Sequence, residues 1–544
     1  MEKLPNHYKN VLIVSLILII TFFTFKNILN HEFIHSWDDL LQVTDNADIR
    51  KLSIENLKKI FISSYVNMYQ PITTITYGID YMVNGIDSSV FHLSNLIIHL
   101  IAVILVYFLI IWLGLGYISA GFTALLYATG PLVVEPVAWI SARSTLLSSV
   151  FFFAAFLYYL KYLANETRSA IILAQLFYLL ALLSRVTVVV FPFIMLLAEI
   201  YLKKDWRSGK LMIAKLWFLF ISIPVVWIGL SFRDFSGTYG SIWEIPLFMI
   251  PKTLWYLDYW LPVHSLSPVY SMPGWLDFRH LSALIFISGW ILLYVKVPAV
   301  RKNILFGLFF FLICIGPYFI YSHYLNPVAD RYGYLALFGV YLILGSLLSH
   351  VIKSKKPVPA IALFIILFSL NIIASSTYST AWKDPVHLWY HATRTVPDIS
   401  YAHQKLGIAY LKERNIELAI ESLTNAIQTD SLNTLAIYNL GSANYQRKKY
   451  PEALALYDKA IRLSPGVSLF YSGRAKTHLF MRKYDIAIAD LDQSIALAKT
   501  PDPELYYLRG ICKIKAGESP CTDLNIALKL GLDAALAKIA THCL

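Results

Sequence analysis

Apolar stretches long enough to cross a bilayer recur through the first 380 residues, and they stop near residue 378. A transmembrane helix needs about 20 consecutive, mostly apolar residues. We count eleven such stretches: 10–29, 93–113, 116–134, 145–164, 168–184, 186–202, 211–231, 280–297, 303–322, 332–351 and 358–377. They predict an all-α membrane domain, a polytopic helix bundle, over 1–380. A linker over 381–399 and a second, soluble-type domain over 400–544 are expected to follow.

The first apolar run, Val11–Phe25, is interpreted as an uncleaved span because no small-residue cleavage site follows it. A twelfth stretch, 245–262, contains prolines, Lys252 and Asp258 among aromatic residues. If the N-terminus is cytoplasmic, the basic loops between spans stay cytoplasmic only when 245–262 does not cross. We therefore predict that 245–262 is interfacial or re-entrant. An odd number of spans then places the C-terminal domain outside the cytoplasm.

The composition agrees with a membrane protein, since 57% of the residues are hydrophobic and 15% are charged. Soluble chains carry about 25% charged residues. The formal net charge of +12 comes from Lys and Arg clusters between the apolar stretches, a bias typical of cytoplasmic loops. These clusters form no long basic stripe with interleaved aromatics, so we predict a lipid bilayer as partner and no nucleic acid.

Small residues recur every 34 residues in the last domain: Gly407, Gly441 and Ala475, and Ala419, Ala453 and Ala487. Such positions let the two helices of one repeat approach closely. The period and the sequence Leu406-Gly407-x-x-Tyr410 are typical of the tetratricopeptide repeat, or TPR. We therefore predict an α-solenoid of three to four TPRs over 400–544, a fold that usually binds a peptide or a protein.

Three of the four cysteines, Cys512, Cys521 and Cys543, lie in this last domain. A domain outside the cytoplasm faces an oxidising compartment, where disulfides form. We favour a bond between Cys521 and Cys543, which would close the terminal helices. The alternative is that all three cysteines are small, buried apolar residues.

The longest loop of the membrane domain, 30–92, contains the adjacent carboxylates Asp38 and Asp39 soon after the first span ends. Two carboxylates at the mouth of a helix bundle are able to act as a general base, to hold a divalent cation, or both. Capping of a helix is the alternative role, because Asp is a common cap residue. The sequence thus offers Asp38 and Asp39 as catalytic residues, and a divalent cation as the cofactor to consider.

Polar side chains follow one face of the second predicted span. His92, Asn95 and His99 are spaced i, i+3 and i+7, which places them on one side of a helix. Such a stripe must face protein or a water-filled cavity. Hydrogen bonding between helices is the alternative to substrate binding.

Further charged residues lie on the same predicted outer side. Glu135 and Arg143 follow the third span and are close enough in sequence to pair with each other. His323 and Arg331 precede the tenth span. An arginine at the interface suits a phosphate, or it anchors the helix in the headgroup layer. Because these groups converge on one side of the membrane, we predict a substrate-binding site there.

The order of these motifs resembles one known family. The segments are Trp37-Asp38-Asp39, Tyr69-x-Pro71-Ile72-Thr73, Phe91-His92-x-x-Asn95-x-x-x-His99, Pro131-x-x-x-Glu135 with Arg143, and Asp330-Arg331-Tyr332-x-Tyr334. With the TPRs that follow, they are similar to the transmembrane and TPR-containing (TMTC-type) O-mannosyltransferases and their bacterial relatives in the GT-C superfamily. The resemblance departs at Gly130 and Val133, where the family has histidines, and at Arg185-Val186, where it has Lys-Glu.

The resemblance implies transfer of a mannose-like sugar from a polyprenyl- or dolichyl-phosphate carrier to an acceptor protein that the TPR domain recruits. By position, Asp38 or Asp39 would be the base and Arg331 would hold the lipid phosphate, with Arg143 as a second candidate. The other residues implied to line the cavity are His92, Asn95, His99 and Glu135. We expect a multi-pass protein of a bacterial inner membrane, with a cytoplasmic N-terminus and a periplasmic TPR domain.

Two other functions are compatible with the sequence. One is a GT-C transferase that acts on a lipid or surface glycan, and the other is a non-catalytic, membrane-anchored TPR scaffold. Transport is disfavoured, because the spans contain no obvious inverted repeat and their polar groups cluster at one face.

Overall fold

The computed structural model describes residues 6–232, 245–271, 274, 280–321, 327–352 and 357–543. Within these ranges the chain is helical and contains no β-strand, apart from one isolated bridge between Tyr65 and Met68. The chain divides into two compact units, Met1–His391 and Ala392–Leu544. Each unit is all-α, as the hydrophobic pattern predicted.

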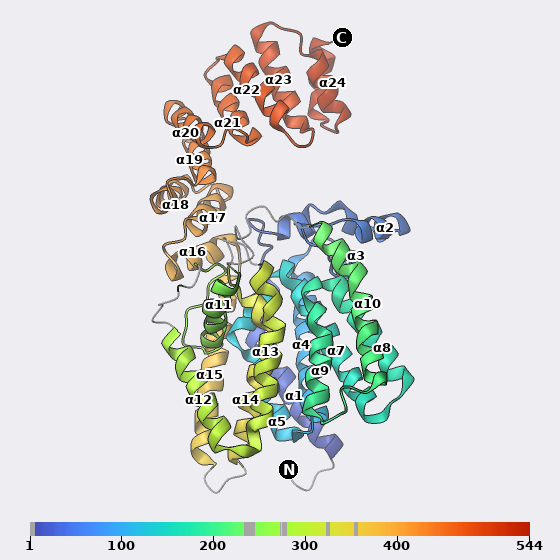
Figure 1. Ribbon diagram of the computed structural model, residues 1–544. Coiled ribbons are helices and arrows are strands. Elements are labelled where there is room, and N and C mark those ends of the chain that lie inside the picture. Colours follow the sequence, from blue (N-terminus) through green and yellow to red (C-terminus); the bar gives the residue numbers. More distant parts are fainter. Residues whose placement is uncertain are drawn as a thin grey trace. The chain divides into compact units, whose positions relative to one another are not determined.

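The first unit is a bundle of long apolar helices that run side by side (Figure 1). Its main helices are α1 (Asn6–Phe25), α4 (Ser88–Trp112), α5 (Gly116–Thr129), α7 (Arg143–Asn165), α8 (Arg168–Ser184), α9 (Phe191–Tyr201), α10 (Gly209–Ser231), α11 (Ile245–Tyr259), α12 (His280–Lys296), α13 (Arg301–Tyr321), α14 (Asp330–Ile352) and α15 (Val358–Ala381). Every predicted apolar stretch coincides with one of these helices.

Among the described residues, seven helices are long and apolar enough to cross a membrane. An eighth span arises if α5 and the bent segment after it, Pro131–Ala138, count as one, because a break of 58° separates them. Three shorter apolar helices, Arg168–Ser184, Val186–Tyr201 and Leu281–Lys296, occupy the remaining predicted positions. The membrane character of the unit is therefore confirmed, and the count of eleven spans stays a prediction.

Glycines allow α13 and α14 to pack with their backbones almost in contact. A Cβ atom placed on Gly339 would lie 2.1 Å from the carbonyl oxygen of Gly307, and one on Gly307 would lie 2.4 Å from that of Gly339. Small residues at such crossings are typical of membrane helices, which associate through close packing. Any side chain at either position would force the two helices apart.

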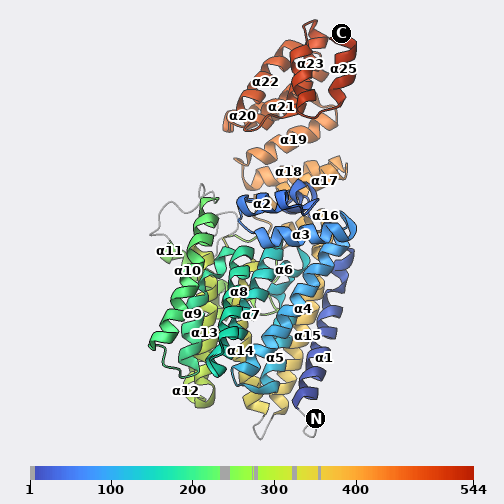
Figure 2. The ribbon, with the colours of Figure 1, turned by 90° about the vertical axis from the view of Figure 1, so that its right-hand side faces the viewer.

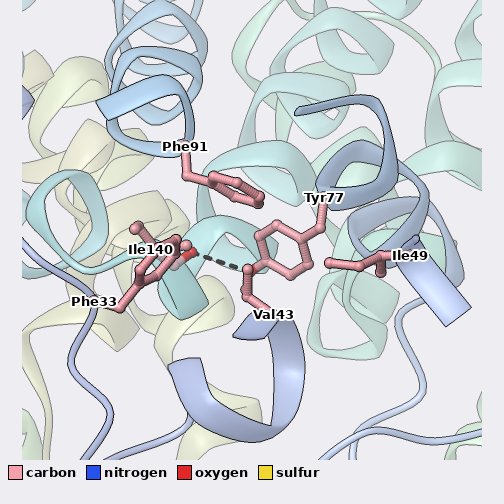
Figure 3. Packing of buried hydrophobic residues seen from close by; sticks show 6 residues of the cluster. All are labelled: Phe33, Val43, Ile49, Tyr77, Phe91 and Ile140. Atoms are coloured by element: carbon pink, nitrogen blue, oxygen red, sulfur yellow. Dashed lines mark hydrogen bonds between the residues drawn. The ribbon is translucent and has the colours of Figure 1, made fainter. Parts of the chain in front are cut away.

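The long first loop folds over one end of the bundle. It forms α2 (Ile54–Ile62) and α3 (Pro71–Asn84), and α2 lies across the long helices at the end where α1 finishes (Figure 2). A core cluster fixes the loop to the bundle: Phe33, Val43, Ile49, Tyr77, Phe91 and Ile140. In Figure 3 the Tyr77 hydroxyl donates to the Ile140 carbonyl across 3.0 Å, which ties α3 to the short turn Ile140–Ala142.

Helix α11 lies against α14, and the segment after it comes back to the first residue of α14. Its Tyr256 hydroxyl donates to the Ala329 carbonyl (3.0 Å) beside the start of α14, and its neighbour Trp260 packs against Tyr341, with ring centroids 6.3 Å apart. Tyr341 lies about 16 Å farther along α14 at the usual helical rise. The chain then returns, because the Tyr270 hydroxyl donates to Asp330 (2.7 Å) at the first residue of α14.

The segment expected to be a linker carries a helix, α16 (Pro385–Thr395), and its tryptophans belong to the first unit. Trp389 is buried and donates to the Ser36 hydroxyl (2.7 Å) in the first loop. Trp382 is also fully buried. Residues 382–389 thus complete the membrane unit, which extends to His391.

The described part of the second unit consists of four helix pairs and a last helix. Its helices are α17 (Ser400–Lys412), α18 (Ile416–Thr429), α19 (Thr434–Gln446), α20 (Tyr450–Leu463), α21 (Ser468–Phe480), α22 (Tyr484–Leu497), α23 (Pro503–Ala516), α24 (Cys521–Lys529) and α25 (Ala534–His542). A Cβ on Gly407 would meet Leu423 at 2.5 Å, so the repeated small residues do mark close helix contacts. A disulfide joins Cys521 to Cys543, the pair favoured from the sequence, and Cys512 is buried and free.

Candidate functional site

A cavity of about 320 Å³ opens at the end of the bundle that the first loop covers. Segments far apart in the sequence form it: the first loop, the turn before α7, the segment after α8, and the ends of α13 and α14. Its polar and aromatic lining includes Trp37, Asp38, Gln70, Trp139, Ser141, Ser144, Arg185, Tyr318, Arg331 and Tyr332. Of the residues proposed from the sequence, Asp38 and Arg331 line this cavity.

The two adjacent carboxylates have different surroundings. Asp39 is fully buried and accepts hydrogen bonds from the Ile34 amide (2.7 Å), the Ser141 amide (3.0 Å) and the Ser141 hydroxyl (2.5 Å). Burial raises the pKa of Asp39, and these hydrogen bonds oppose the shift. Asp39 therefore joins the first loop to the turn before α7, while its half-buried neighbour Asp38 lines the cavity.

Arg331 lies in the cavity with its charge already paired. Its guanidinium forms an ion pair with Glu135, and its backbone amide donates to the other Glu135 oxygen (2.8 Å). The Arg331 guanidinium also lies over the rings of Trp139 (5.3 Å) and Trp37 (5.8 Å), which stack on each other with centroids 4.4 Å apart. Glu135 and the two indoles hold this arginine in one orientation at the cavity wall.

Arg143 is not part of the cavity lining. Its side chain has no exposed surface and forms an ion pair with Asp80 at 2.5 Å. It also donates to the Asn95 side-chain oxygen (2.7 Å) and to the Phe91 carbonyl (2.8 Å). Arg143 therefore pairs with Asp80, and the pairing with Glu135 considered from the sequence does not occur.

The polar face of α4 contributes to the framework as well. Asn95 is buried and donates to the Trp139 carbonyl (3.2 Å), which positions a cavity residue from behind. His99 bonds through one ring nitrogen to the Tyr334 hydroxyl (2.7 Å) and through the other to the Ala128 carbonyl (3.1 Å). His92 is buried, and neither it nor His99 lines the cavity. The predicted His323 lies outside the described residues.

Arg185 is a cavity residue that was not among those proposed from the sequence. It follows α8 directly, and its Nη1 donates to the Thr145 hydroxyl (2.7 Å) and the Ser144 hydroxyl (3.2 Å). In the sequence it stood out only as a departure from a family pattern. Its place just after a predicted span, on the same side as Asp38, was the signal that could have identified it.

A divalent cation has no evident cage in the described part of the chain. No group of three or more His, Cys, Asp or Glu side chains converges there to hold a metal ion. Three hydrogen bonds engage the Asp39 carboxylate. Of the two neighbours, Asp38 is the one that lines the cavity. The arrangement offers a carboxylate, two guanidiniums and several hydroxyls around one space.

Comparison with known proteins supports this architecture. A tetratricopeptide repeat family model matches residues 405–468. The mouse "Protein O-mannosyl-transferase TMTC3" is 34% identical over 136 residues, which cover 23% of this chain and 14% of that protein. The Caenorhabditis elegans "Protein O-mannosyl-transferase F38B6.6" is 24% identical over 434 residues, covering 74% of this chain and 59% of that protein. These curated relatives are TMTC-type protein O-mannosyltransferases.

The match to the C. elegans TMTC-type protein covers more of the chain than the second unit contains, so it includes much of the membrane unit. The chain spans less than two thirds of the length of either relative in these matches. Among solved structures, the crystal structure of MamA protein is 23% identical and covers 29% of this chain and 85% of that chain, with a TM-score of 0.25.

Proposed function

We propose that the membrane unit is a glycosyltransferase of the GT-C type that moves a mannose-like sugar from a polyprenyl-phosphate carrier to a protein acceptor. The observation that carries the proposal is the cavity, where Asp38 shares one space with Arg331 and Arg185 at the end of an apolar bundle. The names of the curated relatives, which are protein O-mannosyltransferases, support it.

Asp38 is proposed as the general base. A hydroxyl of the acceptor attacks the anomeric carbon, the bond from that carbon to the phosphate oxygen breaks, and Asp38 takes the hydroxyl proton. The phosphate leaves with its lipid, so the enzyme must orient the hydroxyl, stabilise the departing anion and exclude water. Asp39 acts indirectly, because its bonds to Ile34 and Ser141 fix the loop that presents Asp38.

The position of the cavity suits a lipid-linked donor. Its wall includes Val186 and Gly229, and Gly229 belongs to α10, an apolar helix long enough to cross a membrane. A carrier lipid would reach the cavity from the bilayer while the sugar stays at the polar end. We propose further that the protein lies in a bacterial inner membrane and that the TPR unit recruits the acceptor outside the cytoplasm.

The proposal is tested with membranes from cells that express the chain. The membranes receive polyprenyl-phosphate mannose labelled in the sugar, and label is counted in precipitated protein and in extracted lipid. We expect wild type to label protein, Asp38→Asn to label almost none, and the exposed loop variant Asp45→Asn to match wild type. Label that moves only into lipid would favour a surface-glycan transferase. Equal labelling by wild type and Asp38→Asn would overturn the role of Asp38.

A further inference from the structure

The two cavity arginines differ in how their charge is compensated. Arg331 pairs with Glu135, whose side chain is 1% exposed, so this pair brings no net charge to the cavity. In the part of the chain that the structure describes, no carboxylate lies within ion-pair distance of Arg185. Its hydrogen-bond partners, Ser144 and Thr145, are neutral hydroxyls.

Arg185 also keeps donors available. A guanidinium carries five N–H groups, and within the described ranges only Nη1 of Arg185 makes hydrogen bonds. The guanidinium lies over Tyr318 (5.4 Å) and Tyr332 (5.8 Å), which stack with centroids 4.4 Å apart. The ring of Tyr332 lies 4.9 Å from the Arg331 guanidinium as well. Tyr332 therefore contacts both an arginine that is paired with Glu135 and an arginine without a carboxylate at ion-pair distance.

We infer that Arg185 is the residue that binds the phosphate of a lipid monophosphate, and that Arg331 is a fixed part of the cavity wall. A guanidinium presents a fork of donors that matches phosphate oxygens, and such charge-assisted bonds are about twice as strong as neutral ones. An arginine without a carboxylate at ion-pair distance suits the single charge of a phosphodiester. This inference rests on the proposed function and replaces Arg331 as the expected phosphate ligand.

The test measures binding, with no turnover required. Full-length protein in detergent is titrated with farnesyl phosphate, with farnesol, which lacks the phosphate, and with inorganic phosphate, and affinity is read by thermophoresis. The variants are Arg185→Gln, Arg185→Lys and the double variant Glu135→Gln/Arg331→Gln, which removes both charges of the buried pair. Arg168→Gln is the matched control, because Arg168 is exposed at the other end of the same helix.

We expect wild type and Arg168→Gln to bind farnesyl phosphate at least roughly tenfold more tightly than farnesol, the gain typical of a hydrogen bond to a charged group. Arg185→Gln should lose that preference, and Arg185→Lys should keep part of it. The double variant should retain it, if Glu135 and Arg331 are only wall residues. If Arg185→Lys keeps part of the preference for farnesyl phosphate, the loss in Arg185→Gln does not come from misfolding.

Three results would overturn the inference, and each has a different meaning. If Arg185→Gln still prefers farnesyl phosphate as wild type does, Arg185 is not the ligand, while the proposed lipid-phosphate donor stands. If the double variant alone loses the preference, Arg331 is the phosphate ligand. If wild type binds farnesol and farnesyl phosphate equally, or binds inorganic phosphate as tightly as farnesyl phosphate, the lipid-phosphate donor class itself fails.

Discussion

Replacing Arg143 with glutamine should destabilise the membrane unit severely. Arg143 and Asp80 form an ion pair in which the side chains are 0% and 6% exposed. Removing one partner leaves a carboxylate buried without compensation, which costs about 3–5 kcal/mol. That loss changes the unfolding equilibrium by roughly two to three and a half orders of magnitude. It is a large part of the roughly 5–15 kcal/mol that holds a typical protein folded.

The double variant Asp80→Asn/Arg143→Gln separates the charge from the packing. It has no lone buried charge, and replacing both partners of a buried pair is often tolerated. We therefore expect Arg143→Gln to aggregate at a much lower temperature than wild type in size-exclusion profiles of heated samples, and the double variant to recover much of that loss. Arg168→Gln, on the surface of α8, should behave as wild type. Equal heat stability of Arg143→Gln and wild type would refute the framework role.

Three further outcomes follow from the packing. Gly339→Ala should lower the free energy of unfolding by about 1–3 kcal/mol, because the added methyl group at the contact with Gly307 must separate two helices. Reducing the Cys521–Cys543 bond, which has a sequence separation of 22, should destabilise the second unit by about 3 kcal/mol, measured by thermal unfolding with and without reductant. Burial alone would raise the pKa of Asp523, but hydrogen bonds from an arginine and a lysine lower it. The stabilisation that Asp523 contributes is therefore fully present above its unfolded pKa of about 3.9. It is lost as the pH falls through the lower folded pKa. In acid titrations of stability, Asp523→Asn should show a smaller loss of stability over this range than wild type.

The sequence predicted the features that repeat. Apolar stretches of spanning length and a 34-residue period fix local structure wherever they occur, so the bundle and the TPR helices were predictable. That the segment 245–262 does not cross the membrane stays a prediction from the basic loops.

Features that depend on contacts between distant segments could not be predicted from the sequence. Asp38 and Asp39 are neighbours, and only the contact of Asp39 with Ser141, 102 residues away, shows which of them faces the cavity. Arg143 has Glu135 close in sequence, yet its partner is Asp80. Arg185 reached the cavity because α8 ends beside the start of α7, where Ser144 and Thr145 receive its hydrogen bonds.

Glycoproteomics of the cell envelope is the decisive test of Asp38 as the base of a glycosyltransferase. Cells that carry wild type, Asp38→Asn or Asp45→Asn are compared for glycans on exported proteins, with each variant confirmed to be present at wild-type level. We expect a defined hexose mass to disappear from a set of proteins in Asp38→Asn and to persist in Asp45→Asn. Identical protein glycans in all three strains would contradict it, and would favour a scaffold in which the carboxylate is structural.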